Sequence, residues 1–373
     1  MPGLIRIMRK HLHMHEISAG SDIELAQCVL PAGDLAQTMR FFIETLGFRL
    51  DAIMPADEPR SAQLSGYGLR LLLDAEFHGD PGVLRLGMAR DEAHAVLVAP
   101  NRTQIEFAPA RPPLHMPPLQ SRLCIQRMDD QPGNWKAGRA GMQYRDLIPD
   151  RQGGRFIASH IRIPRGGPVG DNVHYHDIQL QLIYCLNGWV RLVYEDQGEP
   201  FVMRAGDCVL QPPQIRHRVL EASDGLEVIE IGSPAEHMTW LDHRMDLPTG
   251  RHLTERDYAG QRFVFHQQEH ARWSPQPGGW TRRDLGIATA TGGLAGACVI
   301  RRTVEEAAAD TSTLQQKQFA FAFVLAGSMQ LHVDTAPAQA LAAGDAFVVP
   351  AGVQQHYANC SADCELLQLF LPA

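Results

Sequence analysis

The sequence lacks any apolar run long enough to span a membrane, and it lacks an excess of positive charge. None of its apolar segments approaches the roughly 20 residues that cross a bilayer as a helix. Lys and Arg together number 34 against 42 Asp and Glu, which gives a formal net charge of -8. Nucleic-acid affinity depends on clustered cations. We therefore expect neither a membrane nor a nucleic acid as a partner.

The seven cysteines form no CxxC pair, so the sequence offers no zinc knuckle or redox motif. The odd number favours a reducing compartment, and we expect a cytoplasmic protein. The glycine-rich strings PRGGPVG and TGGLAGA lack the lysine or the strand-to-helix setting of a phosphate-binding loop. No pattern typical of a nucleophile triad is present. Hydrolase and nucleotide-binding functions are therefore disfavoured.

A chain of 373 residues exceeds what one hydrophobic core normally serves, so we expect two or three compact units of about 100 to 150 residues. The first fifteen residues, MPGLIRIMRKHLHMH, lack the continuous apolar segment of a signal peptide, and we expect residues 1–20 to be an arm. Met8 and Met14 are alternative starts.

Residues 21–110 show a mixed pattern. The segment 23–30 predicts a strand, and Asp34 is placed to cap an amphipathic helix that ends at Gly47. Further strands are expected at 49–53, 62–64, 69–73, 95–98 and 100–107. The expected order of this small α+β module is βαβββ.

The strings GDLAQTMRFFIETLGFRL and APNRTQIEFA in this module resemble the vicinal-oxygen-chelate, or glyoxalase-like, family. That resemblance implies metal ligands at Gln27 and Glu106. A complete site in the family is built from two such modules, and the sequence has one. We therefore expect Gln27 and Glu106 to be ordinary sheet residues.

Residues 111–150 are rich in Pro, Arg and Gln, which predicts a linker. Beyond it, short β-branched and aromatic runs alternate with Gly, Pro and Asp, a pattern typical of an all-β barrel or sandwich. The strings GDCVLQPPQIRH (206–217) and GDAFVVPAGVQQH (344–356) are a divergent repeat. We expect a mainly β chain with two barrels, at 151–245 and 246–373.

Three histidines in the first barrel are candidate functional residues. His174 and His176 lie two apart on an expected strand, so both imidazoles project from one face. Gln181 follows in the same segment, with Gly188 at the next turn. The hairpin that begins at Gly206 then brings His217 toward the same interior.

This pattern resembles the cupin superfamily. Its first motif is HxH, three or four residues, Glu, six residues and Gly. Its second is Gly, five residues, Pro and a His five residues later, which here ends at His217. The resemblance implies one divalent metal ion held by His174, His176 and His217. Gln181 stands where the family has its acid, either as a fourth ligand or as a hydrogen-bonding neighbour, and Gln214 replaces a usual Gly.

Three neutral imidazoles and a neutral amide leave the double charge of the ion uncompensated, which favours an anionic bidentate substrate. Nitrogen ligands with open positions favour Fe(II), with Ni, Mn, Cu and Zn as alternatives. Tyr184 and Arg216 are candidate substrate or neighbouring contacts, Arg216 because a cation suits an anion. His160 and Arg162 alternate on the strand before the first motif, where they either reach the pocket or, as we expect, face solvent.

The same template laid over the second barrel finds no equivalent histidines. Thr313 and Gln315 occupy the HxH positions, Ala320 the acid position and Gln355 the position of the third histidine. His356 is one residue out of register, which turns it to the opposite face. We expect this barrel to be metal-free and structural.

The resemblance to bicupins with three-histidine sites implies a metal-dependent dioxygenase, an oxidoreductase that takes O2 and a small oxygenated anion such as a hydroxy-aromatic acid or a 1,3-diketone. Two alternatives stay open: a cupin isomerase or lyase in which the ion polarises a carbonyl, and a non-catalytic ligand-binding protein. A homodimer is expected from both parent families.

Overall fold

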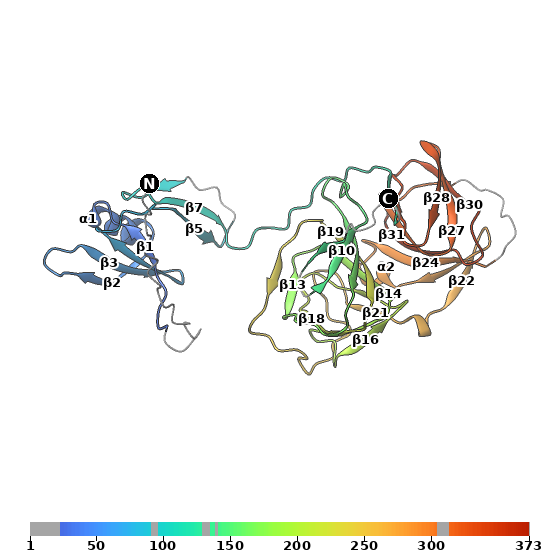
Figure 1. The fold of residues 1–373 in the computed structure, drawn as a ribbon, viewed down its shortest axis with the longest axis horizontal. Helices are drawn as coiled ribbons and strands as arrows, with labels where there is room; N and C mark the ends of the chain where they lie inside the picture. The colour runs from blue at the N-terminus through green and yellow to red at the C-terminus, as the bar shows by residue number, and fades with distance from the viewer. Residues whose placement is uncertain (1–22, 91–95, 129–134, 139–140, 304–312, 373) are drawn as a thin grey trace, which may run out of the picture. The chain divides into compact units, whose positions relative to one another are not determined.

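The computed structural model describes residues 23–90, 96–128, 135–138, 141–303 and 313–372. The chain divides into two compact units, Met1–Pro113 and Leu114–Ala373 (Figure 1). No helix within the described ranges is long and apolar enough to cross a membrane. Most of the regular structure is β, as the sequence predicts.

The N-terminal unit contains two sheets and one helical segment. The four-stranded sheet has the order β1-β4-β3-β2, with β1 (Cys28–Pro31) parallel to β4 (Leu69–Asp74), and with β2 (Arg49–Met54) and β3 (Ser61–Gly66) antiparallel. The three-stranded sheet has the order β5-β7-β6, from β5 (Val83–Met88), β6 (Leu97–Val98) and β7 (Gln104–Pro109). The order β1-α1-β2-β3-β4 matches the predicted βαβββ pattern.

The helix begins and ends where the sequence predicts. Asp34 accepts a hydrogen bond from the Gln37 backbone N–H at 3.0 Å, which caps α1 (Leu35–Arg40). The helix continues as a π-helical turn, η1 (Phe41–Thr45), and stops at Gly47, whose φ of +76° suits glycine. Phe42 is fully buried against the core of the four-stranded sheet.

The second unit, from Leu114 onward, is built from two pairs of sheets (Figure 1). The first sheet pair consists of a seven-stranded sheet, β21-β17-β14-β19-β11-β10-β9, and a smaller sheet, β16-β15-β18-β13-β20, with β12 beside β18. Its strands are β9 (Lys136–Ala137), β10 (Gln143–Asp146), β11 (Ile157–Ile163), β12 (Gly167–Pro168), β13 (His174–His176), β14 (Leu180–Asn187), β15 (Trp189–Tyr194), β16 (Phe201–Arg204), β17 (Cys208–Leu210), β18 (His217–Ala222), β19 (Leu226–Ser233), β20 (Thr239–Leu241) and β21 (Val264–His266).

The second sheet pair repeats this plan with a seven-stranded sheet, β22-β23-β24-β31-β26-β29-β8, and a four-stranded sheet, β25-β30-β27-β28. Its elements are β8 (Cys124–Gln126), η3 (Gln268–His270), β22 (Trp273–Gln276), β23 (Trp280–Asp284), α2 (Ile287–Ala290), β24 (Gly296–Arg302), β25 (Thr313–Leu314), β26 (Phe319–Ala326), β27 (Ser328–Val333), β28 (Ala336–Ala342), β29 (Ala346–Val348), β30 (Gln354–Ala358) and β31 (Glu365–Leu371).

The predicted linker over 111–150 needs a correction. β8 pairs with β29 of the second sheet pair, whereas β9 and β10 extend the larger sheet of the first. These strands are two to four residues long, too short for an alternating pattern to show against the Pro-rich and Gln-rich background. Partner strands from distant parts of the chain, which composition does not reveal, order this segment.

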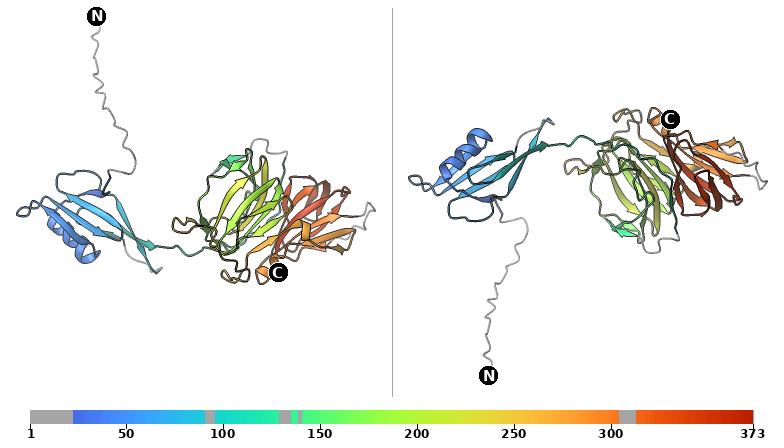
Figure 2. Two further views of the ribbon diagram at one scale, coloured as in Figure 1. Left: turned by 90° about the horizontal axis from the view of Figure 1, so that it is seen from below. Right: turned by 90° about the horizontal axis from the view of Figure 1, so that it is seen from above.

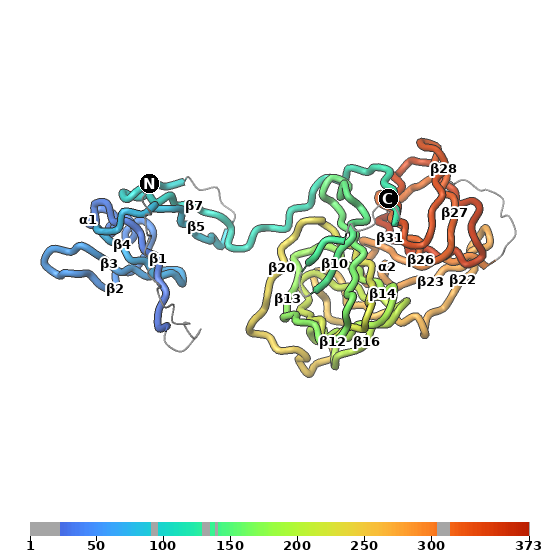
Figure 3. Tube along the Cα trace, in the orientation of Figure 1, coloured from blue at the N-terminus to red at the C-terminus, as the bar shows by residue number. Residues whose placement is uncertain are grey.

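The predicted border at residue 245 also differs from the pairing. β21 adds to β17 at the edge of the first sheet pair, with Cys208 opposite His266. The tube in Figure 3 shows the yellow stretch that follows β20 remaining beside the first sheet pair before the chain turns into the orange strands. The first sheet pair therefore extends past residue 245.

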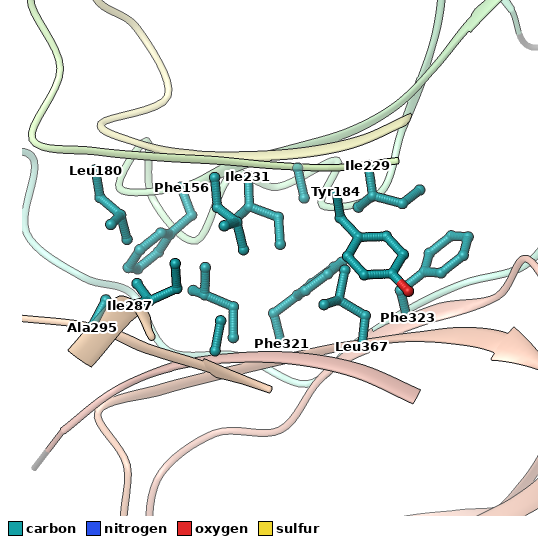
Figure 4. Packing of buried hydrophobic residues seen from close by; sticks show 14 of the residues in the cluster. Phe156, Leu180, Tyr184, Ile229, Ile231, Ile287, Ala295, Phe321, Phe323 and Leu367 are labelled. Atoms are coloured by element: carbon teal, nitrogen blue, oxygen red, sulfur yellow. The ribbon is translucent and has the colours of Figure 1, made fainter. Parts of the chain in front are cut away.

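The two larger sheets pack face to face and form one core. The two sheet pairs lie side by side in both views of Figure 2. Phe156 and Phe319 stack in this core with ring centroids 3.7 Å apart. Ile229 from the first sheet pair and Leu367 from the second belong to the same core (Figure 4). Because Phe156 and Phe319 are almost fully buried, this interface resembles a domain core more than a contact between independent domains.

Phe156→Ala is expected to lower the free energy of unfolding of the full chain by about 3–5 kcal/mol, because it removes a fully buried aromatic ring and leaves a cavity. Urea unfolding followed by circular dichroism measures this change. Leu253→Ala, at an exposed side chain, should stay within about 0.5 kcal/mol of the unmodified chain. Equal effects of the two substitutions would contradict a shared core between the larger sheets.

Candidate metal centre

The structure brings His174, His176 and His217 together inside the first sheet pair. β13 supplies the first two, and β18 begins at His217, which pairs directly opposite His174 across antiparallel strands. The ring centroid of His174 lies 4.2 Å from that of His217 and 5.3 Å from that of His176. One nitrogen from each ring lies within 4.8 Å of the others. Among the described residues, these three form the one such cluster of His, Cys, Asp or Glu side chains.

Backbone carbonyls fix the tautomer of two of these rings. His174 Nδ1 lies 2.8 Å from the carbonyl oxygen of Asn172, and His217 Nδ1 lies 3.0 Å from that of Ile215. A carbonyl oxygen can only accept, so each Nδ1 carries the hydrogen and each Nε2 keeps a lone pair. This is the arrangement that a metal-binding imidazole requires, with the outer nitrogen held by a hydrogen-bond partner.

The third ring, His176, has its own partners. Its Nδ1 lies 2.9 Å from Oγ1 of Thr239 on the neighbouring strand β20. A fourth histidine, His237, packs edge-on against His176 at 5.3 Å between centroids, with its Nδ1 hydrogen-bonded to the carbonyl of Pro234. Thr239 and His237 lie beyond the two motifs, so the sequence offers no reason to expect them here. Thr239 approaches through the pairing of β20 with β13, and His237 lies just before β20.

Gln181 belongs to a chain of side-chain hydrogen bonds that runs in one direction. The Tyr194 hydroxyl donates to Oε1 of Gln211 at 2.7 Å, Nε2 of Gln211 donates to Oε1 of Gln181 at 3.1 Å, and Nε2 of Gln181 donates to Glu230 at 2.8 Å. Burial raises the pKa of the Tyr194 phenol, so that hydroxyl keeps its proton and remains a donor. Both ends of the Gln181 amide are thus engaged, which favours its reading as a hydrogen-bonding neighbour over that of a fourth ligand.

Glu230 is a third residue of this region that the sequence motifs do not indicate. It lies on β19, opposite Ile183 and diagonally across from Gln181. The carboxylate absent from the motif position is therefore present in the same cavity, on a different strand. One feature of the sequence could have indicated it: Glu230 is an acid within the mostly buried strand LEVIEIGS. A charge on the inward face of a sheet requires a partner.

The histidines lie at the polar end of a cavity of about 310 Å³. Aliphatic side chains form most of its wall, among them Ile161, Ile163, Ile183, Leu192, Val219 and Val228. The polar lining residues are the three histidines, Gln181, Gln211, Glu230 and Thr239, with Tyr144 at the wall. No Lys or Arg occurs among the described residues that line it. The cavity suits a small molecule with an apolar body and one polar end.

Tyr184 does not belong to this site. It is three residues from Gln181 on the same strand, so alternation turns it to the opposite face, into the core between the larger sheets (Figure 4). Its hydroxyl accepts a hydrogen bond from Arg283 of the second sheet pair at 3.1 Å. The expectation that Tyr184 contacts the substrate is corrected by this placement.

Arg216 is turned away for the same reason, because it adjoins His217. Its guanidinium lies 4.0 Å from the Tyr175 ring centroid and 3.2 Å from Asp242. It does not line the cavity. The predicted role of Arg216 beside an anionic substrate is therefore corrected too.

His160 and Arg162 also differ from the expectation that they face solvent. His160 is buried between the sheet pairs, where it contacts Glu227 at 2.6 Å and burial lowers its pKa. Arg162 is partly buried and stacks on Trp135 at 4.0 Å.

Two motif positions at turns, Gln214 and Gly188, adopt left-handed backbone conformations. Gln214, which replaces a usual glycine, adopts a left-handed φ of +62°, and its Nε2 donates to Asp177 at 2.8 Å. Gly188 retains the motif glycine, with φ of +74° and Ser223 Oγ only 2.3 Å from where a Cβ would stand.

In the N-terminal unit, Glu106 of β7 accepts from Arg85 of β5 at 2.8 Å, so its carboxylate is engaged in an ion pair. Gln27 precedes β1, which belongs to the other sheet. The glyoxalase-like resemblance of this unit stays a prediction.

Comparisons with known proteins bear on the fold around the histidines. Residues 159–231 match the family described as cupin domain. This stretch of the chain is therefore similar to a cupin domain. The matched range includes the three histidines, Gln181 and Glu230, and it lies within the first sheet pair. No curated protein matches the chain.

Among solved structures, the chain is similar to protein YlbA from E. coli, with a TM-score of 0.50 and 11% identity over 69% of this chain and 95% of that one. It is also similar to oxalate decarboxylase from Bacillus subtilis, with a TM-score of 0.48, 12% identity, and 68% and 76% of the two chains covered. Oxalate decarboxylase from Lactobacillus farciminis is similar with a TM-score of 0.48 and 14% identity, over 69% of this chain and 89% of that one. At 11% identity, the similarity to YlbA concerns the fold alone.

His217→Ala is expected to weaken the binding of a divalent ion by at least about 100-fold, because it removes one of three converging nitrogens. Isothermal titration of the chelator-treated chain with Co(II) measures the affinity. His270→Ala, at an exposed histidine of η3, is the matched control and should bind within about threefold of the unmodified chain, since His270 lies outside the cluster and is not packed on its rings. Equal losses in both variants would refute the assignment of the ligands.

Proposed function

We propose that this protein is a metal-dependent cupin dioxygenase that uses Fe(II) and acts on a small oxygenated substrate. The observation that carries the proposal is the convergence of three imidazoles at the polar end of an apolar cavity of about 310 Å³. Three nitrogen donors without a protein carboxylate among them leave coordination positions for a substrate and suit Fe(II), with Ni, Mn, Cu and Zn as competing ions.

The donor set fits such an ion. A divalent ion held by His174, His176 and His217 would supply Lewis acidity toward a substrate oxygen and, as Fe(II), reactivity toward O2. The protein's own contribution is orientation: the Asn172 and Ile215 carbonyls hold two rings, and Thr239 contacts the third. The aliphatic side chains of the cavity wall would exclude water and contact the apolar body of the substrate.

Glu230 is the proton acceptor in this proposal. Gln181 donates to one of its oxygens and so fixes the carboxylate at the cavity wall. A hydroxyl or an acidic C–H of the substrate would lose its proton to Glu230 when the substrate oxygens bind. The sequence alone favours an anionic substrate. The Glu230 carboxylate in the cavity offsets part of the charge of the ion, so a substrate that enters as a neutral molecule also fits.

The cavity lining favours a 1,3-diketone over a hydroxy-aromatic acid. A carboxylate that pointed away from the histidines would meet aliphatic side chains, and no Lys or Arg is found among the described lining residues to pair with it. A diketone presents two oxygens at one end and alkyl groups at the other, which matches the polarity of the cavity.

An isomerase or lyase is the second candidate, and Glu230 is the observation that favours it, because an acid beside a polarised carbonyl also catalyses proton transfer. The two activities differ in their use of oxygen. A non-catalytic ligand-binding protein would show no turnover at all.

The Fe(II)-loaded chain is expected to consume O2 with pentane-2,4-dione or a longer 1,3-diketone as substrate. Oxygen-electrode recording with product analysis measures this uptake. Glu230→Gln should lower kcat/KM by about 100-fold or more, because it removes the proton acceptor and preserves shape. Tyr144→Phe, which alters the cavity wall without changing charge, is the matched control and should retain most of the activity.

Turnover of the same substrates at an equal rate without air would transfer the assignment to a lyase or isomerase. A chain that binds iron at the three histidines and turns over no diketone or hydroxy-aromatic acid would contradict an enzymatic role toward these substrates.

A further inference from the structure

The second sheet pair contains a cavity of its own, with a volume of about 210 Å³. Its polar lining residues are Gln315, Lys317, Gln355, Tyr357 and Gln368, and its apolar wall includes Phe347 and Phe370. This volume is below that of a pocket for a drug-sized ligand and suits a smaller molecule. The expectation of a purely structural second barrel gives this cavity no role.

Strand register shows that the cavity occupies the place of the metal centre. In the first sheet pair His174 pairs with His217, and in the second Thr313 pairs with Gln355. Ala320 stands opposite Phe370 as Gln181 stands opposite Gly232.

The same register places Gln368 opposite Ala322, where Glu230 stands opposite Ile183. Gln315, Gln355 and Gln368 thus stand where the first sheet pair has His176, His217 and Glu230, while a cavity is kept. The alanines at 320 and 322 are smaller than Gln181 and Ile183, which leaves room for a ligand without a metal.

Two amide oxygens of this cavity accept hydrogen bonds from other parts of the chain. Oε1 of Gln315 accepts from the backbone N–H of Lys317 at 2.9 Å. Oε1 of Gln368 accepts from Sγ of Cys298 at 3.7 Å, and its Nε2 donates to the Tyr357 hydroxyl oxygen at 3.2 Å. The Tyr357 hydroxyl therefore has its own hydrogen to donate, and burial raises the pKa of this phenol.

The charge of the lining is positive. Lys317 is exposed, with Nζ 5.0 Å from the centroid of the Phe370 ring, so the ammonium lies at the open side of the cavity. No Asp or Glu occurs among the described residues that line it. An ammonium, a phenol hydroxyl and an amide N–H are the groups that bind a carboxylate, and aromatic walls suit a flat apolar body.

We propose that the second sheet pair binds a small aromatic carboxylate, without a metal ion, in the cavity lined by Gln315, Lys317, Tyr357 and Gln368. Tyr357 and Lys317 contact the carboxylate, and Phe347 and Phe370 contact the ring. This site is independent of the histidine cluster and of the reaction proposed for it.

Isothermal titration of the full chain with benzoate tests the proposal, after chelator treatment so that no ion at the histidines can bind the probe. Benzoate is expected to bind at least about tenfold more tightly than benzamide, its neutral isostere. Lys317→Met should weaken benzoate binding by about tenfold, and Ala320→Leu, which fills the cavity, should abolish it. His217→Ala should leave it unchanged.

Lys136→Met, at an exposed lysine of the first sheet pair, is the matched control and should bind benzoate as the unmodified chain does. Thermal unfolding of each variant establishes that it is folded. Absence of benzoate binding at millimolar concentration, equal binding of benzamide, or unchanged binding in folded Lys317→Met would each overturn the proposal.

Discussion

The antiparallel pairing of His174 with His217 is the contact on which the metal centre depends. It places two imidazoles directly opposite each other, and the two-residue repeat of a strand adds His176 on the same face. Backbone carbonyls at Asn172 and Ile215 then turn the Nε2 atoms inward. A shift of one residue in this pairing would turn His217 to the outer face and separate the cluster.

The same register rule explains how one scaffold supports two kinds of cavity. The first sheet pair places His176, His217 and Glu230 at positions where the second places glutamines. The larger sheets join the two across a shared core around Phe156 and Phe319. One face of β14 and one face of β26 are buried in this shared core. The opposite faces line the two cavities and can therefore differ in their side chains.

Much of this arrangement could be predicted from local sequence. The spacing of His174, His176 and His217 gives the cluster, and Asp34 and Gly47 give the ends of the helix, because these signals depend on neighbours in the chain. Tyr184 and Arg216 were assigned to the site against the alternation of their strands: three residues from Gln181 and one residue from His217 are both odd spacings, which face away.

Glu230 could not be assigned in the same way. It reaches Gln181 only through the pairing of β14 with β19, which joins residues 49 positions apart in the chain. The short strands β8, β9 and β10 are similar, because distant partners order them. Long-range pairing therefore sets the limit of the sequence analysis, both for the acid of the site and for the segment taken as a linker.

The central claim is that one divalent ion binds the three Nε2 atoms and no other part of the chain. An anomalous difference map from crystals of the Fe(II)-loaded chain, recorded at the iron absorption edge under anaerobic conditions, tests it most directly. The account predicts one strong peak within about 2.0–2.3 Å of Nε2 of His174, His176 and His217, and none in the second sheet pair. A peak bound through other residues, or none at the histidines at full iron loading, would contradict it.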